Sequence, residues 1–309
     1  MVVGGGGFLG TNLCLRLLSR GGRVGAFGLR CPFRDKMPGL EWHTGDFRDD
    51  KALAGALNGF EIVFHLVHTT IPYSANLDIE KDLAENVTPS LKLLDMSRGL
   101  GVKRIIFISS GGTVYGAATQ FPTPESAHTY PLTAYAVSKL AIEKYLALYE
   151  NLYQLDFRVL RLANPFGPFQ VANKGQGVIA ALIAHALNRE PMDIWGNGSV
   201  VRDYIYVDDV IDAMEAIILD QSDHRIFNIG TGQGRILREV ITTVQRLMGV
   251  SIDTRMAEQR ALDVPKSVLS IERAKAVLGW APKTDFEDGV RNTIAWWKSG
   301  LAIFSELPP

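Results

Sequence analysis

Short apolar runs alternate with longer amphipathic segments through the first two thirds of the chain. The short runs are predicted strands, and the clearest of them span residues 24–27, 62–66, 105–109 and 157–162. Between them apolar residues recur every three or four positions, which predicts helices over residues 11–19, 86–100 and 134–152. Strands that alternate with helices form parallel sheets, and strands apolar on both sides lie between two helical layers. We therefore predict an α/β fold with a Rossmann-type doubly wound parallel sheet.

The pattern changes after Asn164, where prolines and glycines separate shorter elements. We expect a Rossmann domain over residues 1–165 and a smaller C-terminal α/β lobe over residues 166–309, from which some segments return to the Rossmann sheet. Only three residues precede the first glycine of the chain, whereas a buried strand usually has about five. Either the first strand is short or the chain begins late.

The composition of the chain indicates which kinds of partner and which cell compartment to expect. Of the 309 residues 47% are hydrophobic, and 32 Lys and Arg balance 33 Asp and Glu, so no excess of positive charge favours nucleic acid. Cys14 and Cys31 are the two cysteines of the sequence, which favours a reducing compartment. The sequence contains no run of 18 apolar residues, and no basic segment precedes the glycines. It therefore gives no sign of a membrane span or of a signal peptide. We expect a cytoplasmic protein without a nucleic-acid or membrane partner.

A glycine-rich segment lies between the first short apolar run and the first predicted helix. Gly4, Gly7 and Gly10 recur at intervals of three. Glycines at such a place permit a tight turn, let backbone amides approach a pyrophosphate and put the positive end of the helix beside it. The motif is weak alone, but its position between a strand and a helix indicates a dinucleotide site.

The second predicted strand ends without the acidic residue that usually binds the ribose hydroxyls of NAD. It ends in Gly28, Leu29 and Arg30. Arg30 is suited to pair with the 2′-phosphate of NADP, but a solvated arginine is equally consistent with the sequence. The choice between NAD and NADP stays open.

Tyr135 and Lys139 lie four residues apart and therefore on one face of the predicted helix 134–152. A free tyrosine has a pKa near 10, too high for an efficient base, and a nearby ammonium group would favour the phenolate. The pair follows a buried strand that ends in Ser109 and Ser110, the edge at which open α/β sheets bind ligands. This context distinguishes the pair from a chance surface pair.

Taken in order, these pieces resemble the extended short-chain dehydrogenase/reductase family, in particular its NAD-dependent epimerases and dehydratases of the UDP-glucose 4-epimerase kind. The resemblance runs almost from end to end of the chain. Besides the glycine loop and the Tyr135–Lys139 pair, the matching segments are 45–49 (GDFRD), 64–66 (FHL), Asn86, 109–116 (SSGGTVYG), 161–168 (RLANPFGP), 202–209 (RDYIYVDD), 228–232 (NIGTG) and 278–280 (LGW).

The resemblance implies two sets of binding residues and no metal. NAD, or NADP, would be bound by Gly4, Gly7, Phe8, Leu9, Gly10, Arg30, Asp46, Phe47, Leu66, His68, Ser109, Tyr135 and Lys139, with Asp46 and Phe47 flanking the adenine. The nucleotide diphosphate of a sugar nucleotide would be bound by Asn164, Gly177, Val178, Trp195, Arg202 and Arg260. Trp195 would stack on the base, unless it is a core aromatic. Arg202 would bind the diphosphate, unless it pairs with Asp203 or Asp209.

Two positions depart from the family pattern. Gly111 stands where these epimerases usually carry a catalytic serine or threonine, so that Ser110 or Thr113 would supply the hydroxyl instead. Val67 and His68 replace the usual pair of alanines after the strand at 62–66. His68 is then a spacer on the nicotinamide side or a proton relay, whereas His65 is structural.

The function that the resemblance implies is epimerisation of a nucleotide sugar, most simply a UDP-hexose at C4 through a 4-keto intermediate. Tyr135 would be the base, and Lys139 would bind the nicotinamide ribose and lower the tyrosine pKa. The alternatives are an NADP-dependent reductase, which Arg30 favours, a dehydratase, which Gly112 and Thr113 disfavour, and a non-catalytic cofactor sensor. A homodimer through the helices 86–100 and 134–152 is also implied.

Overall fold

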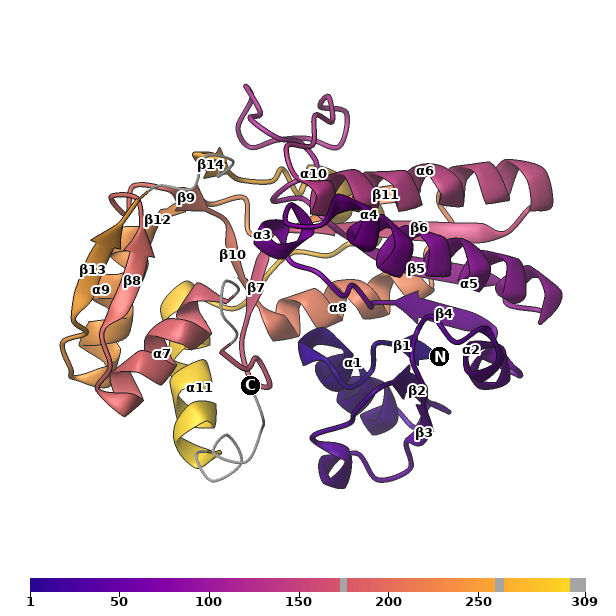
Figure 1. Cartoon of the computed structure of the whole chain (residues 1–309), viewed down its shortest axis with the longest axis horizontal. Coiled ribbons are helices and arrows are strands. Elements are labelled where there is room, and N and C mark those ends of the chain that lie inside the picture. The colour runs from indigo at the N-terminus through magenta and orange to yellow at the C-terminus, as the bar shows by residue number, and fades with distance from the viewer. Residues whose placement is uncertain (173–176, 259–263, 301–309) are drawn as a thin grey trace.

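A seven-stranded parallel sheet forms the centre of the computed structural model, which describes residues 1–172, 177–258 and 264–300 (Figure 1). Its strand order is β11-β6-β5-β4-β1-β2-β3, and every neighbouring pair is parallel. The strands are β1 (Val2–Val3), β2 (Gly25–Gly28), β3 (Glu41–Thr44), β4 (Ile62–His65), β5 (Arg104–Ser110), β6 (Asp156–Leu162) and β11 (Ile226–Ile229). The order runs outward in both directions from the middle of the sheet, so the predicted doubly wound topology is confirmed.

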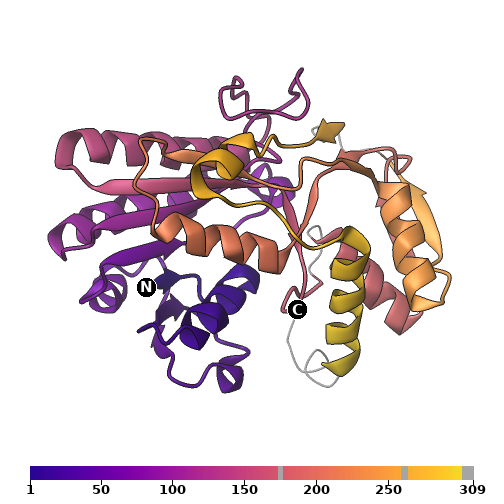
Figure 2. The same cartoon turned by 180° about the vertical axis from the view of Figure 1, so that it is seen from behind.

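Helices cover both faces of this sheet (Figures 1 and 2). One face carries α2 (Asp50–Leu57), α5 (Thr88–Gly99) and α6 (Ala134–Tyr153), and the other carries α1 (Phe8–Ser19), α8 (Val207–Ile218) and α10 (Glu272–Leu278). Successive side chains of a strand point to opposite faces. In β5, Ile105 and Phe107 accordingly join the core under α5 and α6, while Ile106 and Ile108 join the core under α8.

A smaller lobe lies beside the sheet, at the left of Figure 1. Its helices are α7 (Val178–Asn188), α9 (Leu237–Met248) and α11 (Phe286–Ser299). Its strands form a pair, β8 (Met192–Trp195) with β13 (Thr254–Ala257), and a three-stranded sheet of β12 (Arg235–Ile236), β9 (Val201–Arg202) and β14 (Lys266–Ser267). The parallel pair β7 (Asn164–Phe166) and β10 (Tyr204–Tyr206) connects this lobe to the Rossmann sheet.

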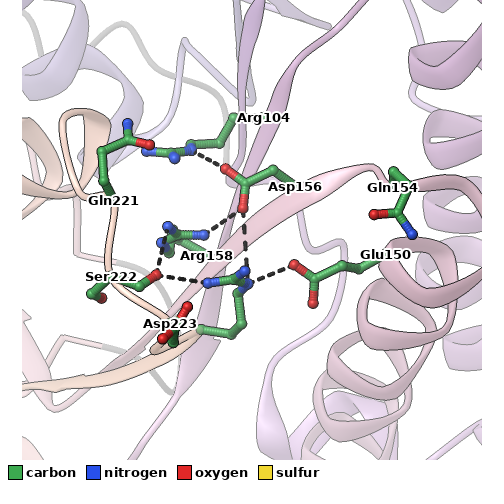
Figure 3. Close-up of a pocket in the computed structure, with 9 residues that line it drawn as sticks. Arg104, Glu150, Gln154, Asp156, Arg158, Gln221, Ser222 and Asp223 are labelled. Carbon is green, nitrogen blue, oxygen red and sulfur yellow. Dashed lines mark hydrogen bonds and ion pairs between the residues drawn. The ribbon is translucent and has the colours of Figure 1, made fainter.

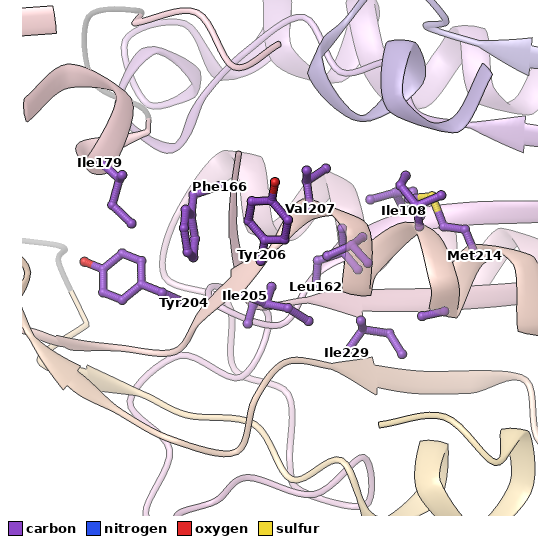
Figure 4. Packing of buried hydrophobic residues seen from close by; sticks show 14 of the residues in the cluster. Ile108, Leu162, Phe166, Ile179, Tyr204, Ile205, Tyr206, Val207, Met214 and Ile229 are labelled. Atoms are coloured by element: carbon purple, nitrogen blue, oxygen red, sulfur yellow. The ribbon is translucent and has the colours of Figure 1, made fainter. Parts of the chain in front are cut away.

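The hydrophobic core continues from the sheet into the lobe across this strand pair (Figure 4). Phe166 is buried and lies 5.8 Å from the ring of Tyr206 and 5.6 Å from the ring of Phe286, measured between ring centroids. Ile205 is fully buried between Leu162 of the sheet and the lobe. Because one continuous core supports both parts, side chains at the β7–β10 junction are held firmly relative to the sheet.

Three short helical segments fill the stretch between β4 and α5. They are α3 (Pro72–Ala75), α4 (Ile79–Asp82) and the π-helical turn η2 (Leu83–Val87), and a 3-10 turn, η1 (Arg34–Lys36), precedes β3. The helix predicted from residue 86 therefore begins earlier, and its start is a π-helical turn. This winding turns the buried side chains of Asp82 and Asn86 toward the end of β4, where Thr69 and Thr70 contact them.

A polar pocket at the amino ends of β5 and β6 is filled by ion pairs (Figure 3). Asp156 binds both Arg104 and Arg158 at 2.5 Å, and Arg158 also binds Asp220 at 2.5 Å. Arg225 binds Glu150 at 2.6 Å. Ligands of open α/β sheets bind at the carboxyl ends of the strands. This network lies at the opposite end, with its cations already paired, so it stabilises the sheet edge and is no candidate site.

Candidate active site

Tyr135 and Lys139 lie in the first turns of α6, beside the carboxyl end of β5. Thr133 caps the helix by accepting a hydrogen bond from the amide of Ala136. The Lys139 Nζ donates to the carbonyl of Ile108 at 2.8 Å and lies 5.7 Å from the centre of the Tyr135 ring. The predicted pairing of phenol and ammonium on one helix face is therefore present.

Burial shifts the pKa of both members of this pair. Desolvation raises the pKa of Tyr135 to about 12, with hydrogen bonding to Ser110 acting in the opposite direction and the charge of Asp82 adding to the rise. Desolvation likewise lowers the pKa of Lys139 to about 7, against the charges of Glu143 and Asp82. Removal from bulk water is the largest influence on both pKa values, and the expectation that Lys139 together with an oxidised nicotinamide lowers the tyrosine pKa stays a prediction.

Three residues at the end of β5 and just beyond it lie in different surroundings. The Ser110 hydroxyl interacts with the phenol of Tyr135, whereas the buried Thr113 Oγ1 has no hydrogen-bond partner among the described residues. A Cβ at Gly111 would lie 2.5 Å from Leu269 Cδ1 and 3.1 Å from the Arg161 carbonyl oxygen. Leu269 thus occupies the space that a serine at position 111 would need, and Ser110 is the hydroxyl beside the phenol.

A buried ion pair beneath this site was not predicted from the sequence. Glu143 accepts hydrogen bonds from Arg161 at 2.6 Å and from the Ser109 hydroxyl at 2.5 Å, and all three side chains are buried. Glu143 lies four residues beyond Lys139, so its helical spacing was the available signal. It fixes the end of β5 against α6, and its charge favours the protonated form of Lys139.

His68 and Asp82 form a second group on the other side of Tyr135. The His68 ring lies edge-on to the Tyr135 ring, with 4.6 Å between centroids. Asp82, which no sequence signal marked, is buried and accepts hydrogen bonds from Ser138 at 2.5 Å and from Thr70. His65 is buried behind this group, within hydrogen-bond distance of Ser90 at 2.7 Å, as its structural role predicted.

The glycine loop fits a dinucleotide. Gly4 has a φ of +95°, and its amide donates to the Phe27 carbonyl at 2.8 Å. A Cβ at Gly10 would lie 2.3 Å from the Gly4 carbonyl oxygen, so only glycine lets α1 start this close to the loop. The first turn of α1, from Phe8 and Leu9, leaves backbone amides without intrahelical partners, and these suit a pyrophosphate.

The other predicted cofactor residues divide into exposed and buried groups. Arg30 is exposed, and Asp46 is bound at 2.7 Å to Arg48, which lowers the pKa of Asp46 to about 2. The Phe47 side chain is largely buried, with its ring centroid 5.1 Å from that of His65, and its place beside the adenine stays a prediction. Leu66 is partly buried at the end of β4, and the Ser109 hydroxyl is already bound to Glu143.

The predicted substrate residues lie in or next to the smaller lobe. Asn164 opposes Tyr204 in the β7–β10 pair, and its Nδ2 donates to the Asp203 carbonyl at 3.1 Å. Arg202 ends β9, and Gly177, with a φ of +75°, caps α7 before Val178. Arg260 lies outside the described residues.

Trp195 and Arg202 each had a structural alternative to substrate binding. Trp195 is 45% exposed and therefore is not a core aromatic. Asp203 accepts hydrogen bonds from Thr231 and from backbone amides, and Asp209 accepts them from the amides of Lys283 and Thr284. Both carboxylates therefore accept hydrogen bonds from backbone amides, and the choice between a diphosphate and an ion pair as the partner of Arg202 stays a prediction.

Neither a metal centre nor a membrane-spanning helix is present among the described residues. Across residues 1–172, 177–258 and 264–300, no three His, Cys, Asp or Glu side chains are grouped to hold a metal ion. Within the same ranges no helix has both the length and the apolar character needed to cross a membrane.

Comparison with known proteins gives consistent relatives. Residues 1–230 match the model of the NAD dependent epimerase/dehydratase family. A UDP-glucose 4-epimerase of Mycolicibacterium smegmatis is 33% identical, covering 97% of this chain and 98% of its own. Among solved structures, UDP-glucose 4-epimerase from Thermotoga maritima with UDP-glucose has a TM-score of 0.91 at 32% identity, covering 97% and 98% of the two chains. The complex of Thermus thermophilus UDP-glucose 4-epimerase with NAD has a TM-score of 0.90 at 31% identity, covering 96% and 98%.

Proposed function

The chain belongs to the NAD-dependent epimerase/dehydratase family, and from this premise we propose that it is an NAD-dependent nucleotide-sugar epimerase acting on a UDP-hexose at C4. The observation that carries the proposal is the phenol of Tyr135 beside Ser110 and Lys139 at the carboxyl edge of the sheet. The fit of the glycine loop to a dinucleotide supports NAD as its cofactor.

Tyr135 is the base of the proposed reaction and takes the proton of the sugar 4-hydroxyl. Ser110 donates a hydrogen bond to the phenolate form of Tyr135, which stabilises the negative charge on the base. Lys139 is anchored by the Ile108 carbonyl and adds positive charge when protonated. The bound nicotinamide supplies the reversible uptake of hydrogen from C4.

Inversion requires that the 4-keto sugar turn over inside the site and present its other face. The smaller lobe, which we propose binds the nucleotide diphosphate through Asn164, Gly177, Val178, Trp195, Arg202 and Arg260, holds the sugar by its nucleotide and leaves the hexose ring able to rotate. Tyr135 then returns the proton to the new hydroxyl. No proton is gained or lost overall, so the site needs no separate acid.

The dehydratase alternative would need an acid that this sequence does not carry at the expected positions. Elimination of water needs a proton donor for the leaving hydroxyl. Gly112 and Thr113 occupy the two positions before Val114 and Tyr115 where dehydratases of this family carry an Asp–Glu pair. The proposal is therefore epimerisation.

Interconversion of UDP-glucose and UDP-galactose, each with its N-acetyl form, tests the function. We expect the purified chain, loaded with NAD and then freed of excess cofactor, to bring either sugar to the same equilibrium mixture on chromatography. The absorbance of reduced nicotinamide should show no net change. Net consumption of NADPH would favour a reductase, and loss of water from the sugar would favour a dehydratase.

Assembly and location are further parts of the proposal. The outer surface of α6 carries exposed Tyr145, Leu148 and Leu152, which supports a homodimer formed by α5 and α6. Cys14 and Cys31 are free thiols, which supports the reducing environment of a cytoplasmic protein.

A further inference from the structure

His68 is the one polar side chain of the described residues whose ring contacts Tyr135. It follows the end of β4, its side chain is 7% exposed, and neither of its ring nitrogens has a hydrogen-bond partner among the described residues. Its neighbours Tyr135, Asp82 and Lys139 come from α6 and α4, so it lies within the candidate active site and outside the apolar core.

An imidazole with two unpaired nitrogens in this position has an energetic cost. A buried polar group without a hydrogen-bond partner destabilises the folded chain. Burial and the positive charge of Lys139 lower the pKa of His68, so the ring is neutral and has one N–H donor and one nitrogen acceptor. These two positions are most simply satisfied when the site holds its ligands.

The carboxylate of Asp82 lies beside one of the two ring nitrogens of His68. Its Oδ1 lies 3.8 Å from His68 Nε2, which is longer than a hydrogen bond, but a movement of roughly 1 Å would close it. The carboxylate itself cannot turn freely because Ser138, Thr70 and Asn86 donate to it. An Nε2–H would face this carboxylate, and Nδ1 would then be the acceptor left for a ligand.

We propose that His68 Nδ1 accepts a hydrogen bond from the 3-hydroxyl of the bound hexose. The inference rests on the proposed function, in which Tyr135 takes the proton of the 4-hydroxyl. The imidazole packs edge-on against the ring of the proposed base. C3 is the neighbour of C4 that carries a hydroxyl, so a hexose with its 4-hydroxyl at the phenol has its 3-hydroxyl in the surroundings of that phenol. A relay of protons is not needed, because an epimerase returns to the sugar the proton that it removes.

Binding of UDP and of UDP-glucose, measured by calorimetry on the NAD-loaded protein, tests the proposal. His68→Phe keeps a ring packed on Tyr135 but removes both nitrogens, and His68→Asn restores an acceptor near the position of Nδ1. We expect His68→Phe to bind UDP-glucose about tenfold more weakly, the loss of one buried hydrogen bond, while its affinity for UDP stays within about twofold. His68→Asn should recover most of the lost affinity.

Deoxy analogues identify the contact directly. In the wild type, UDP-3-deoxyglucose should bind about tenfold more weakly than UDP-glucose, whereas in His68→Phe the two should bind alike. UDP-6-deoxyglucose is the matched control, and the two proteins should respond alike to the loss of its hydroxyl. Equal sensitivity of both proteins to the missing 3-hydroxyl would overturn the proposal. So would an equal loss of UDP and UDP-glucose affinity in His68→Phe, or a loss confined to NAD content.

The readout is independent of turnover. A wild type that binds UDP-glucose but does not interconvert it contradicts the proposed function, and the comparison of UDP with UDP-glucose still decides the role of His68. Thermal unfolding of each variant shows whether it folds. His68→Asn provides the second folded variant if His68→Phe does not purify.

Discussion

Ser109, Ser110 and Gly111 are consecutive, yet each meets a different neighbour at the end of β5. Ser109 binds Glu143, Ser110 interacts with Tyr135, and Gly111 packs against Leu269. Ser110 and Thr113 were equal candidates before the structure, because local sequence contains no information about where the distant Leu269 packs. The structure favours Ser110.

Replacement of Ser110 by alanine should lower kcat about 10- to 100-fold, the effect of losing a hydrogen bond to a charged oxygen. Thr113→Val is the matched control, since it removes a hydroxyl from the same segment without touching the phenol. We expect it to change kcat less than about threefold. Steady-state rates on UDP-galactose measure both, and a Thr113→Val defect larger than that of Ser110→Ala would contradict the assignment.

The protonation of Lys139 makes the stability of the folded chain depend on pH. Its pKa is about 7 in the folded chain and 10.5 when unfolded, so between these values the unfolded state holds more protons. Stability should therefore rise with pH across this window, by about 1 kcal/mol per unit, and the contribution of Lys139 should be least favourable where it is charged, below pH 7. Lys139→Met lacks this contribution.

Urea unfolding at several pH values across this window provides the measurement. Other groups titrate in the same range, but they contribute similarly to both proteins. We expect the wild type to gain stability relative to Lys139→Met as the pH rises. Parallel pH profiles would show that Lys139 is not desolvated in the folded protein.

At the scale of elements, the inner face of α6 contributes to the site and its outer face is the proposed dimer surface. Its inner face carries Tyr135, Ser138, Lys139 and Glu143 toward the site, a set whose spacings of three and four were visible in the sequence. The π-helical turn η2 and the buried Asp82 were not predicted. A wider winding depends on which side chains it must bring to the end of β4, and that is a tertiary requirement.

The outer face of α6 should mediate the dimer. Leu148 and Leu152, exposed at 44% and 59%, are one helical turn apart. Their joint replacement by glutamate would place like charges in the interface, so we expect the mass in solution to fall from a dimer to the 34.0 kDa of one chain.

Light scattering after size-exclusion chromatography measures that mass. Leu219→Glu is the control, because Leu219 is 80% exposed but ends α8 on the opposite face of the sheet. It should leave the dimer intact. A wild type that elutes as a monomer, or a dimer that survives both charges on α6, would contradict the arrangement.

At the scale of the whole molecule, local sequence patterns predicted β2, β4, β5 and β6 clearly, because each is a short apolar run next to a helical segment. Strand β3 was not singled out, and β11 was anticipated only as an unspecified returning segment, since it joins the sheet far along the chain from its neighbour β6. Likewise β7 and β10 are three residues each and gain their stability from the shared core around Phe166 and Ile205. Short strands paired over long distances leave little local signal.

The architecture gives the Rossmann sheet and the smaller lobe different roles in the proposed reaction. The sheet presents Tyr135 and the glycine loop at one edge, and the core under β7 and β10 fixes Asn164 relative to them. A sugar nucleotide held by the smaller lobe would therefore reach a phenol held by the larger one. The proposed reaction depends on that phenol.

Replacing Tyr135 by phenylalanine tests the proposed reaction most directly. UDP-glucose and UDP-galactose should interconvert at least about 10³-fold more slowly in this variant, because the proton of the 4-hydroxyl has no acceptor, while NAD content and UDP affinity stay at wild-type values. Interconversion within a few-fold of the wild-type rate, with the variant folded and loaded with NAD, would contradict a role for Tyr135 as the base.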